Sequence, residues 1–212
     1  MTLNELAYNI LNKLRGGRSS NNEYISLDQI KFNINYYRSL LLHRDLRMSQ
    51  NKHLFEQTIT EEVEEDSMFD FKLKREIPSI IQLNYEFPIS VSKGTKTFPV
   101  ENYHRALFNE YNTFTNNSTR FFIKNRLLFA YGSDSLFAND ELQITAIFEN
   151  PTQAYLFNGE DPIKVDDLPY PISGDLAQRI SQSLINGDFE LILRTANDIT
   201  ADNLSPQPKG QG

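Results

Sequence analysis

The spacing of apolar residues changes twice along this chain, and that change restricts the fold to a combination of helices and strands. From Leu3 to Leu41 apolar side chains recur three or four residues apart, which is typical of amphipathic helices. After Met48 apolar and polar residues alternate, as they do in strands that bury one face. Helical spacing returns from Leu176 to Leu184. Because helices at both ends enclose a β-rich centre, we predict the α+β class.

The expected architecture is a single α+β domain over residues 1–200, in which an N-terminal α-hairpin and a C-terminal helix pack with a central antiparallel β-rich region. Hydrophobic residues make up 39% of the 212 residues, which is sufficient for a core. We expect residues 201–212, which include SPQPKGQG, to form a flexible tail. Helices are expected at about 2–15, 26–48, 100–112 and 173–186, and β-rich segments at 53–98 and 119–150.

Residues with known positional preferences mark the ends of the predicted helices. Ser26 is placed to cap the second helix and Ser173 the last one, because a serine hydroxyl can accept a hydrogen bond from the first turn. Gly16–Gly17 is expected to end the first helix and Asn186–Gly187 the last. The last helix is too short to be stable alone, so it must pack on the N-terminal hairpin, which we favour, or on a neighbouring subunit.

Turn residues and prolines divide the β-rich centre. Two β-prone runs flank Lys124–Asn125 and predict a hairpin. The sequence KGTK at residues 93–96 predicts a turn and lacks the glycine pattern of a phosphate-binding loop. Pro78, Pro88 and Pro99 remove backbone donors, so the strands around them must be short or lie at a sheet edge.

Motifs of catalysis and metal binding are missing from the sequence. The three histidines form no H-E-x-x-H pattern, there is no G-x-S-x-G, and there are no cysteines. We therefore predict no catalytic, cofactor-binding or metal-ligating residues and a protein that is not an enzyme. The net charge of −7 disfavours tight nucleic-acid binding, and no apolar run approaches the roughly 20 residues that span a bilayer.

The acidic run EEVEED at residues 61–66 allows two interpretations. Carboxylates that converge on one point could bind a metal ion or act as an acid–base pair. Residues on a strand instead point alternately to opposite faces, and this favours a solvated, mutually repelling sheet edge. A small hydrolase using a carboxylate pair, drawn from this run or from Asp166–Asp167, remains an alternative function.

Four segments resemble the head–tail connector proteins of short-tailed bacteriophages, most of all the ring or neck proteins of crAss-like phages. LNELAYNILNKLRGG followed by SLDQIKFNINYYRSLLLHRD is similar to their opening α-hairpin, and REIPSIIQL to their proline-containing strand. TRFFIKNRLLFAYG followed by LQITAIFENP is similar to their strand pair, and YPISGDLAQRISQSLING to their closing helix. The likeness extends from about Leu3 to Leu193 and rests on the order of these segments.

The resemblance implies a structural virion protein that assembles in the phage neck. Such proteins form rings, commonly of twelve copies, which join the portal vertex to the tail and leave a channel for DNA ejection. The implied partners are copies of the same chain, the portal protein and other neck or tail ring proteins, with DNA passing without tight binding and no membrane. The implied location is the virion, with assembly in the host cytoplasm. A protein of another neck or tail layer is an alternative.

Two sets of residues are candidates for these roles. Phe32 and Tyr36 make the second helix apolar on more than one side, as expected of a helix with more than one neighbour. In a ring, each copy presents two different patches to its neighbours. Carboxylates that face a channel would repel phosphate. The candidate interface residues are Ile34, Tyr37, Leu41, Leu176, Ile180 and Leu184, and the candidate channel-facing residues are Glu61, Glu62, Glu64, Glu65 and Asp66.

Overall fold

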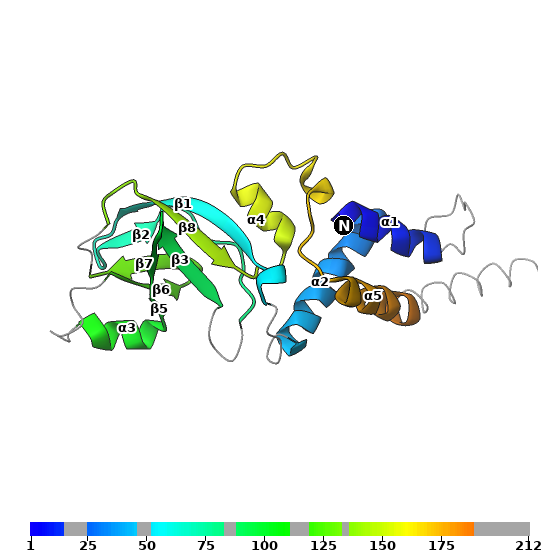
Figure 1. Ribbon diagram of the computed structural model, residues 1–212, viewed down its shortest axis with the longest axis horizontal. Coiled ribbons are helices and arrows are strands. Elements are labelled where there is room, and N and C mark those ends of the chain that lie inside the picture. The colour runs from blue at the N-terminus through cyan, green and yellow to red at the C-terminus, as the bar shows by residue number, and fades with distance from the viewer. Residues whose placement is uncertain (15–24, 46–51, 83–87, 111–118, 133–135, 189–212) are drawn as a thin grey trace, which may run out of the picture.

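The computed structural model describes residues 1–14, 25–45, 52–82, 88–110, 119–132 and 136–188. They form two lobes side by side along the long axis of the molecule (Figure 1). One is a helical lobe of α1, α2 and α5, and the other is a β lobe that contains all the strands and α3. The α+β class is thus confirmed. The predicted stop at Gly16–Gly17 and the predicted tail from residue 201 lie outside the described residues.

The helical lobe consists of α1 (Leu3–Leu14), α2 (Leu27–Asp45) and α5 (Gly174–Ser183). Both predicted caps are present. The Ser26 hydroxyl accepts a hydrogen bond from the backbone N–H of Gln29 at 3.1 Å, and the Ser173 hydroxyl accepts one from the N–H of Leu176 at 3.2 Å. The end of α5 differs from the prediction, because a π-helical turn (η3, Leu184–Asp188) runs through Asn186 and Gly187.

The β lobe is one sheet of eight strands in the order β4-β3-β8-β1-β2-β7-β6-β5. Every neighbouring pair is antiparallel except β5 and β6, which are parallel, so the antiparallel region that the sequence predicts is part of a mixed sheet. The sheet curls, since β4 and β5 lie at opposite ends of this order although only Pro99 separates them in the chain. The strands are β1 (Gln57–Glu65), β2 (Phe71–Leu73), β3 (Ile89–Lys93), β4 (Lys96–Phe98), β5 (Val100–Glu101), β6 (Arg120–Lys124), β7 (Leu127–Tyr131) and β8 (Glu141–Ala146).

Both predicted turns join neighbouring strands. Asn125 and Arg126 between β6 and β7 have φ of 51° and 64°, the left-handed values that a two-residue I′ turn requires, so the hairpin is confirmed. Gly94 between β3 and β4 has φ of 60°, a conformation that suits glycine. The segment around Pro78 was expected to be a strand, but it forms only the isolated bridge between Ile80 and Phe148. Its proline has no N–H to donate to a ladder.

Four further helical segments complete the described chain. Helix α3 (Tyr103–Glu110) follows β5 within the predicted range and covers Phe122 with its Ala106 side. Helix α4 (Pro151–Phe157) was not predicted; Asn150 caps it by accepting from the N–H of Thr152 at 3.1 Å. The remaining segments are short 3₁₀ turns, η1 (Lys52–Leu54) and η2 (Val165–Asp167).

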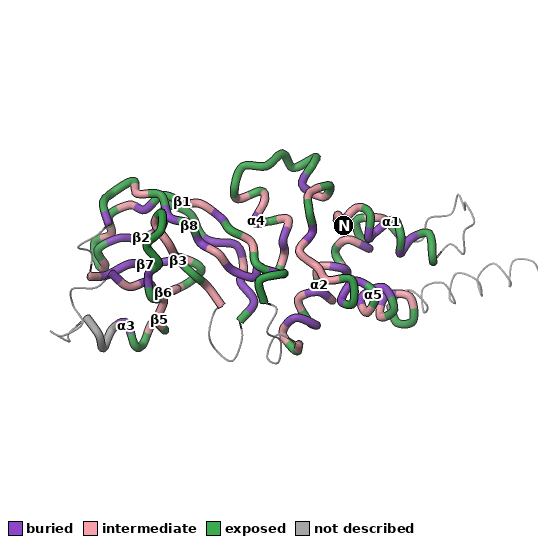
Figure 2. Tube along the Cα trace, viewed as in Figure 1, coloured by how far each residue is buried: buried purple, intermediate pink, exposed green. Residues whose placement is uncertain are grey.

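Each lobe has its own hydrophobic core, and two adjacent extended segments join the cores. Ile80 and Phe148 belong to the β core, whereas their chain neighbours Ile81 and Ile147 belong to the helical core. Successive side chains of an extended chain point in opposite directions, which explains the division. The N–H of Ile81 donates to the carbonyl of Ile147 at 2.9 Å. Buried residues therefore continue from one lobe into the other (Figure 2).

Candidate assembly surfaces

Most of the side chains predicted to form an interface lie inside the chain's own core. Five of the six (Ile34, Leu41, Leu176, Ile180 and Leu184) are at most 9% exposed and belong to the core shared by α1, α2 and α5. The sixth, Tyr37, is half-buried against the same core. Of the two arrangements considered for the last helix, packing on the N-terminal hairpin is the one observed. In the single chain these five side chains are buried in the core, and their role at an interface stays a prediction.

The opposite side of α2 carries an exposed apolar stripe, which we call the α2 ridge. Its residues are Phe32, Tyr36 and Leu40, which are 70%, 57% and 50% exposed. They are four residues apart, so they lie one above another on the helix surface. The Tyr36 ring rests edge-on against Tyr37, with 5.5 Å between the ring centroids. The regular spacing was visible in the sequence, but nothing there showed which apolar side of α2 the core would bury.

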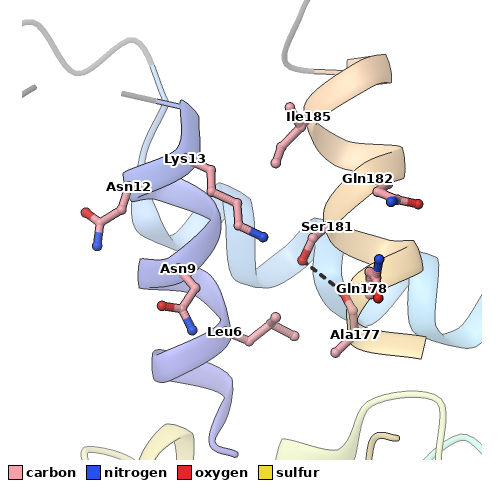
Figure 3. A pocket seen from close by; sticks show the side chains of 9 residues that line it. All are labelled: Leu6, Asn9, Asn12, Lys13, Ala177, Gln178, Ser181, Gln182 and Ile185. Carbon is pink, nitrogen blue, oxygen red and sulfur yellow. Dashed lines mark hydrogen bonds between the residues drawn. The ribbon is translucent and has the colours of Figure 1, made fainter. Parts of the chain in front are cut away.

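A groove runs between α1 and α5 and has a volume of about 710 Å³ (Figure 3). We call it the α1–α5 groove. Apolar side chains contribute to it from both helices, and amides line much of the rest. Figure 3 shows α2 passing behind the two helices that form the groove. Its lining residues are Leu6, Asn9, Asn12, Lys13, Ala177, Gln178, Ser181, Gln182 and Ile185.

The acidic run at residues 61–66 is not at a sheet edge, which corrects the prediction. Most of it belongs to β1, which is hydrogen-bonded to β8 on one side and to β2 on the other. Because residues alternate along a strand, Glu61 is directed to the buried side and is itself buried, whereas Glu62 lies on the exposed side. Glu65 at the end of β1 is exposed.

Basic residues that follow this acidic run in the same chain form ion pairs with it. Glu61 pairs with Arg75 and Glu62 with Lys74. The Lys72 ammonium lies 3.4 Å from a Glu64 carboxylate oxygen and 3.5 Å from one of Asp66. The β1–β2 register brings Glu64 opposite Lys72 directly. Opposite charges facing each other across two strands stabilise a sheet, so the run does not form the mutually repelling surface that the sequence indicated.

Asp66 also organises the turn after β1. Its carboxylate accepts hydrogen bonds from the backbone N–H groups of Met68 and Phe69, both at 3.0 Å. Partial burial of the carboxyl tends to raise its pKa, but the two N–H donors and Lys72 outweigh that effect, so the pKa lies below its usual value. Asp66 therefore stays ionised and holds a turn, which is a structural role.

The described part of the chain offers neither a metal-binding cluster nor a membrane-spanning helix. No group of three or more histidine, cysteine, aspartate or glutamate side chains there is arranged to hold a metal ion. None of the described helices is both long enough and apolar enough to cross a bilayer.

Comparison with known proteins places most of the chain in a described family. The model of a family described as phage tail ring protein 2, defined for crAss-like phages, matches residues 5–205. No curated protein matches the chain. The matched region contains both lobes, the α2 ridge and the α1–α5 groove.

Proposed function

The chain belongs to the phage tail ring protein 2 family of crAss-like phages, and from this premise we propose that it forms a ring in the phage neck that connects the portal vertex to the tail. Membership makes it a structural protein of the phage tail or neck, and a virion component. The proposal adds the level in the particle, contact with the portal protein, a ring of twelve copies and a central channel through which DNA leaves the head.

The observation that carries the proposal is the extent of the match. It includes 201 of the 212 residues, because it runs from residue 5 to residue 205. Because the family model matches both lobes, the two lobes together, and not one of them alone, are expected to act as the ring protein. A structural family also argues against catalysis, and the acidic run supports the same view, because four of its five carboxylates are paired with Lys72, Lys74 or Arg75. The family and these ion pairs therefore disfavour the hydrolase alternative.

The net charge of −7 supports a channel that does not retain DNA. Phosphate groups are repelled by a negative protein, and a duplex that must pass quickly should bind weakly. Glu62, Glu64, Glu65 and Asp66 remain the candidates for the channel side, whereas Glu61 is buried. Because lysines accompany three of these four carboxylates, the surface proposed for the channel has mixed charge with a negative excess.

Native mass spectrometry of the chain, alone and mixed with the portal ring of the same phage, tests the proposal. We expect a complex with one chain for each portal subunit, assembled from material made in the host cytoplasm. Rings that ignore the portal but bind another neck or tail protein would move the chain to a different layer of the particle. A chain that never forms a ring under any of these conditions would contradict the proposal.

A further inference from the structure

We propose that this chain binds another protein of the neck through the loop between α4 and η2 and the adjoining start of α1, and that the partner presents an apolar socket bordered by lysine or arginine. We call this surface the loop face; its loop comprises residues 158–164. The inference rests on the connector function proposed above and adds the part of the chain that meets the next component.

The loop carries an unusually exposed apolar side chain. Ile163 is the most exposed of the large apolar side chains that the structure describes, at 86%. Figure 1 shows the loop as an arch from α4 to η2, and Figure 2 shows it exposed along most of its length. A single exposed apolar residue is common on protein surfaces and means little by itself. The way in which the loop holds Ile163, and the groups around it, give it significance.

Hydrogen bonds within the loop fix the position of Ile163. The Asp161 carboxylate accepts from the backbone N–H of Ile163 at 2.9 Å, and the Asp161 carbonyl accepts from the N–H of Val165 at 3.1 Å. The Val165 side chain is buried, and the next residue, Asp166, forms an ion pair with Lys31 of α2 at 2.7 Å. A side chain on such an ordered backbone loses little conformational freedom when it binds, which favours affinity.

A hollow of about 940 Å³ adjoins the end of this segment, where α1 begins. Two apolar side chains that are about half exposed, Met1 and Tyr8, line it together with the carboxylates of Glu5 and Asp167. Asp167 is the last residue of η2, and Figure 1 shows the N-terminus beside η2. The loop face therefore combines a projecting isoleucine with a partly apolar hollow.

Acidic side chains surround these apolar groups and decide the kind of partner. Glu160 and Asp161 are exposed on the loop, and Glu5 and Asp167 are exposed at the hollow, whereas the loop contains a single basic residue, Lys164. A negative surface repels nucleic-acid phosphates and anionic lipid headgroups, so the partner is a protein. Two copies of this face would also repel each other, so the partner is a different protein with basic residues around its apolar contact.

Titration with the portal ring of the same phage tests the inference. Ile163→Ser should raise the dissociation constant about tenfold, because it removes an apolar side chain that the complex buries. Met68→Ser is the matched control and should leave the dissociation constant unchanged, since Met68 is 71% exposed between β1 and β2 in the other lobe. In native mass spectrometry without the portal, both variants should form the same rings as the natural chain.

A charge reversal tests the acidic part of the face separately. Glu160→Lys should raise the dissociation constant about fivefold, and binding of the natural chain should weaken as the NaCl concentration rises. Asp70→Lys, at an exposed aspartate in the β lobe, is the control and should have little effect. A Glu160→Lys variant that binds as tightly as the natural chain would contradict a basic border around the socket.

The outcomes separate this inference from the connector function. If the natural chain binds the portal ring and Ile163→Ser binds equally well, the inference is overturned and the connector function stands. If Ile163→Ser prevents rings of the chain alone, the loop face joins copies of the chain, which also overturns the inference. If the natural chain binds another purified neck protein in place of the portal ring, the same comparison with that protein decides. A chain that binds none of these proteins overturns the connector function itself.

Discussion

Arg38 is the residue that ties the two lobes together most directly. Its side chain on α2 is fully buried, and it donates to the carbonyl of Phe148 at 2.8 Å and to that of Pro171 at 3.0 Å. The guanidinium also lies 5.7 Å from the centre of the Tyr170 ring. Burial lowers the pKa of Arg38 from its ordinary value to about 10, so the group is still charged at neutral pH. Backbone carbonyls thus take the place of a carboxylate partner at this junction.

At the same scale, Asp45 should make stability depend on pH in acid. Its carboxylate accepts a hydrogen bond from Arg179 and joins α2 to α5; this bond, despite partial burial, lowers the pKa of Asp45 below 3.8. Because the pKa of Asp45 is lower in the folded protein than in the unfolded chain, its ionised form stabilises the fold above about pH 4. This stabilisation is lost as the pH falls through the pKa of the folded protein. We expect Asp45→Asn to cost at most about 1 kcal/mol at pH 6, because the pair is partly exposed.

Urea unfolding at pH 6, 4 and 2.5 measures this effect. The difference between the natural chain and Asp45→Asn should shrink toward zero at the lowest pH. Asp70→Asn, at an exposed aspartate, serves as the control and should show little difference at any pH. A cost of Asp45→Asn that is unchanged between pH 6 and pH 2.5 would contradict the assignment.

Helix α2 shows how one element serves two purposes. One side buries Ile30, Ile34 and Leu42 in the helical core, and the other exposes Phe32 and Tyr36. A helix of a lone globular domain usually exposes a polar face instead. Exposed aromatic residues in a row are typical of surfaces that bind another protein. The buried side therefore supports the fold, and the exposed side is free for assembly.

This division predicts opposite results for two truncations. Ile180→Ala, in α5 at a fully buried position, should lower the free energy of unfolding by about 2–4 kcal/mol because it leaves a cavity. Phe32→Ala on the exposed side should change it by no more than about 0.5 kcal/mol in the monomer. Urea unfolding below the concentration at which rings form compares the two. A Phe32→Ala variant as unstable as Ile180→Ala would show that the ridge packs within the single chain.

At the scale of the whole molecule, the junction decides whether two cores behave as one domain. The extended segments at residues 77–81 and 146–149, together with Arg38, link the lobes, and Phe55 just before β1 also packs in the helical core. Helix α4 packs on the β core, and the Asn158 side chain at its end accepts from the N–H of Thr60 at 3.1 Å and donates to the carbonyl of Thr58 at 3.0 Å. Asn158 thereby gives hydrogen-bond partners to backbone groups of β1 in the part of the strand that β2 does not reach.

Loss of the Arg38 hydrogen bonds should uncouple the lobes. Arg38→Leu leaves the carbonyls of Phe148 and Pro171 without these donors, at a cost of about 2–5 kcal/mol. Amide hydrogen exchange should then become faster in α2 and α5 than in the core strands β1 and β8. Arg44→Leu is the control, because the Arg44 side chain is 72% exposed. If Arg38→Leu does not fold, Arg38→Lys provides the milder comparison. Equal acceleration in both lobes would contradict a junction role.

The sequence by itself determined the features that depend on a few neighbouring residues. The change of apolar spacing, the caps at Ser26 and Ser173 and the hairpin at Asn125 follow from local backbone preferences, so they were predictable. Helix α4 was missed because its seven residues show too little periodicity, and Asn150–Pro151 was interpreted only as the end of a strand. The identity of the family came from the order of segments and not from any single site.

Only the tertiary structure decided which surfaces are buried and which charges meet. The central position of β1 depends on its pairing with β8, far along the chain, while the fold-back onto β2 and the residues after it places Glu61–Arg75 and Glu64–Lys72 in contact. The choice between the two apolar sides of α2 likewise depends on how α1 and α5 pack. Local sequence patterns carry no information about such partners, because hydrophobic burial and ion pairing are set by contacts between distant segments.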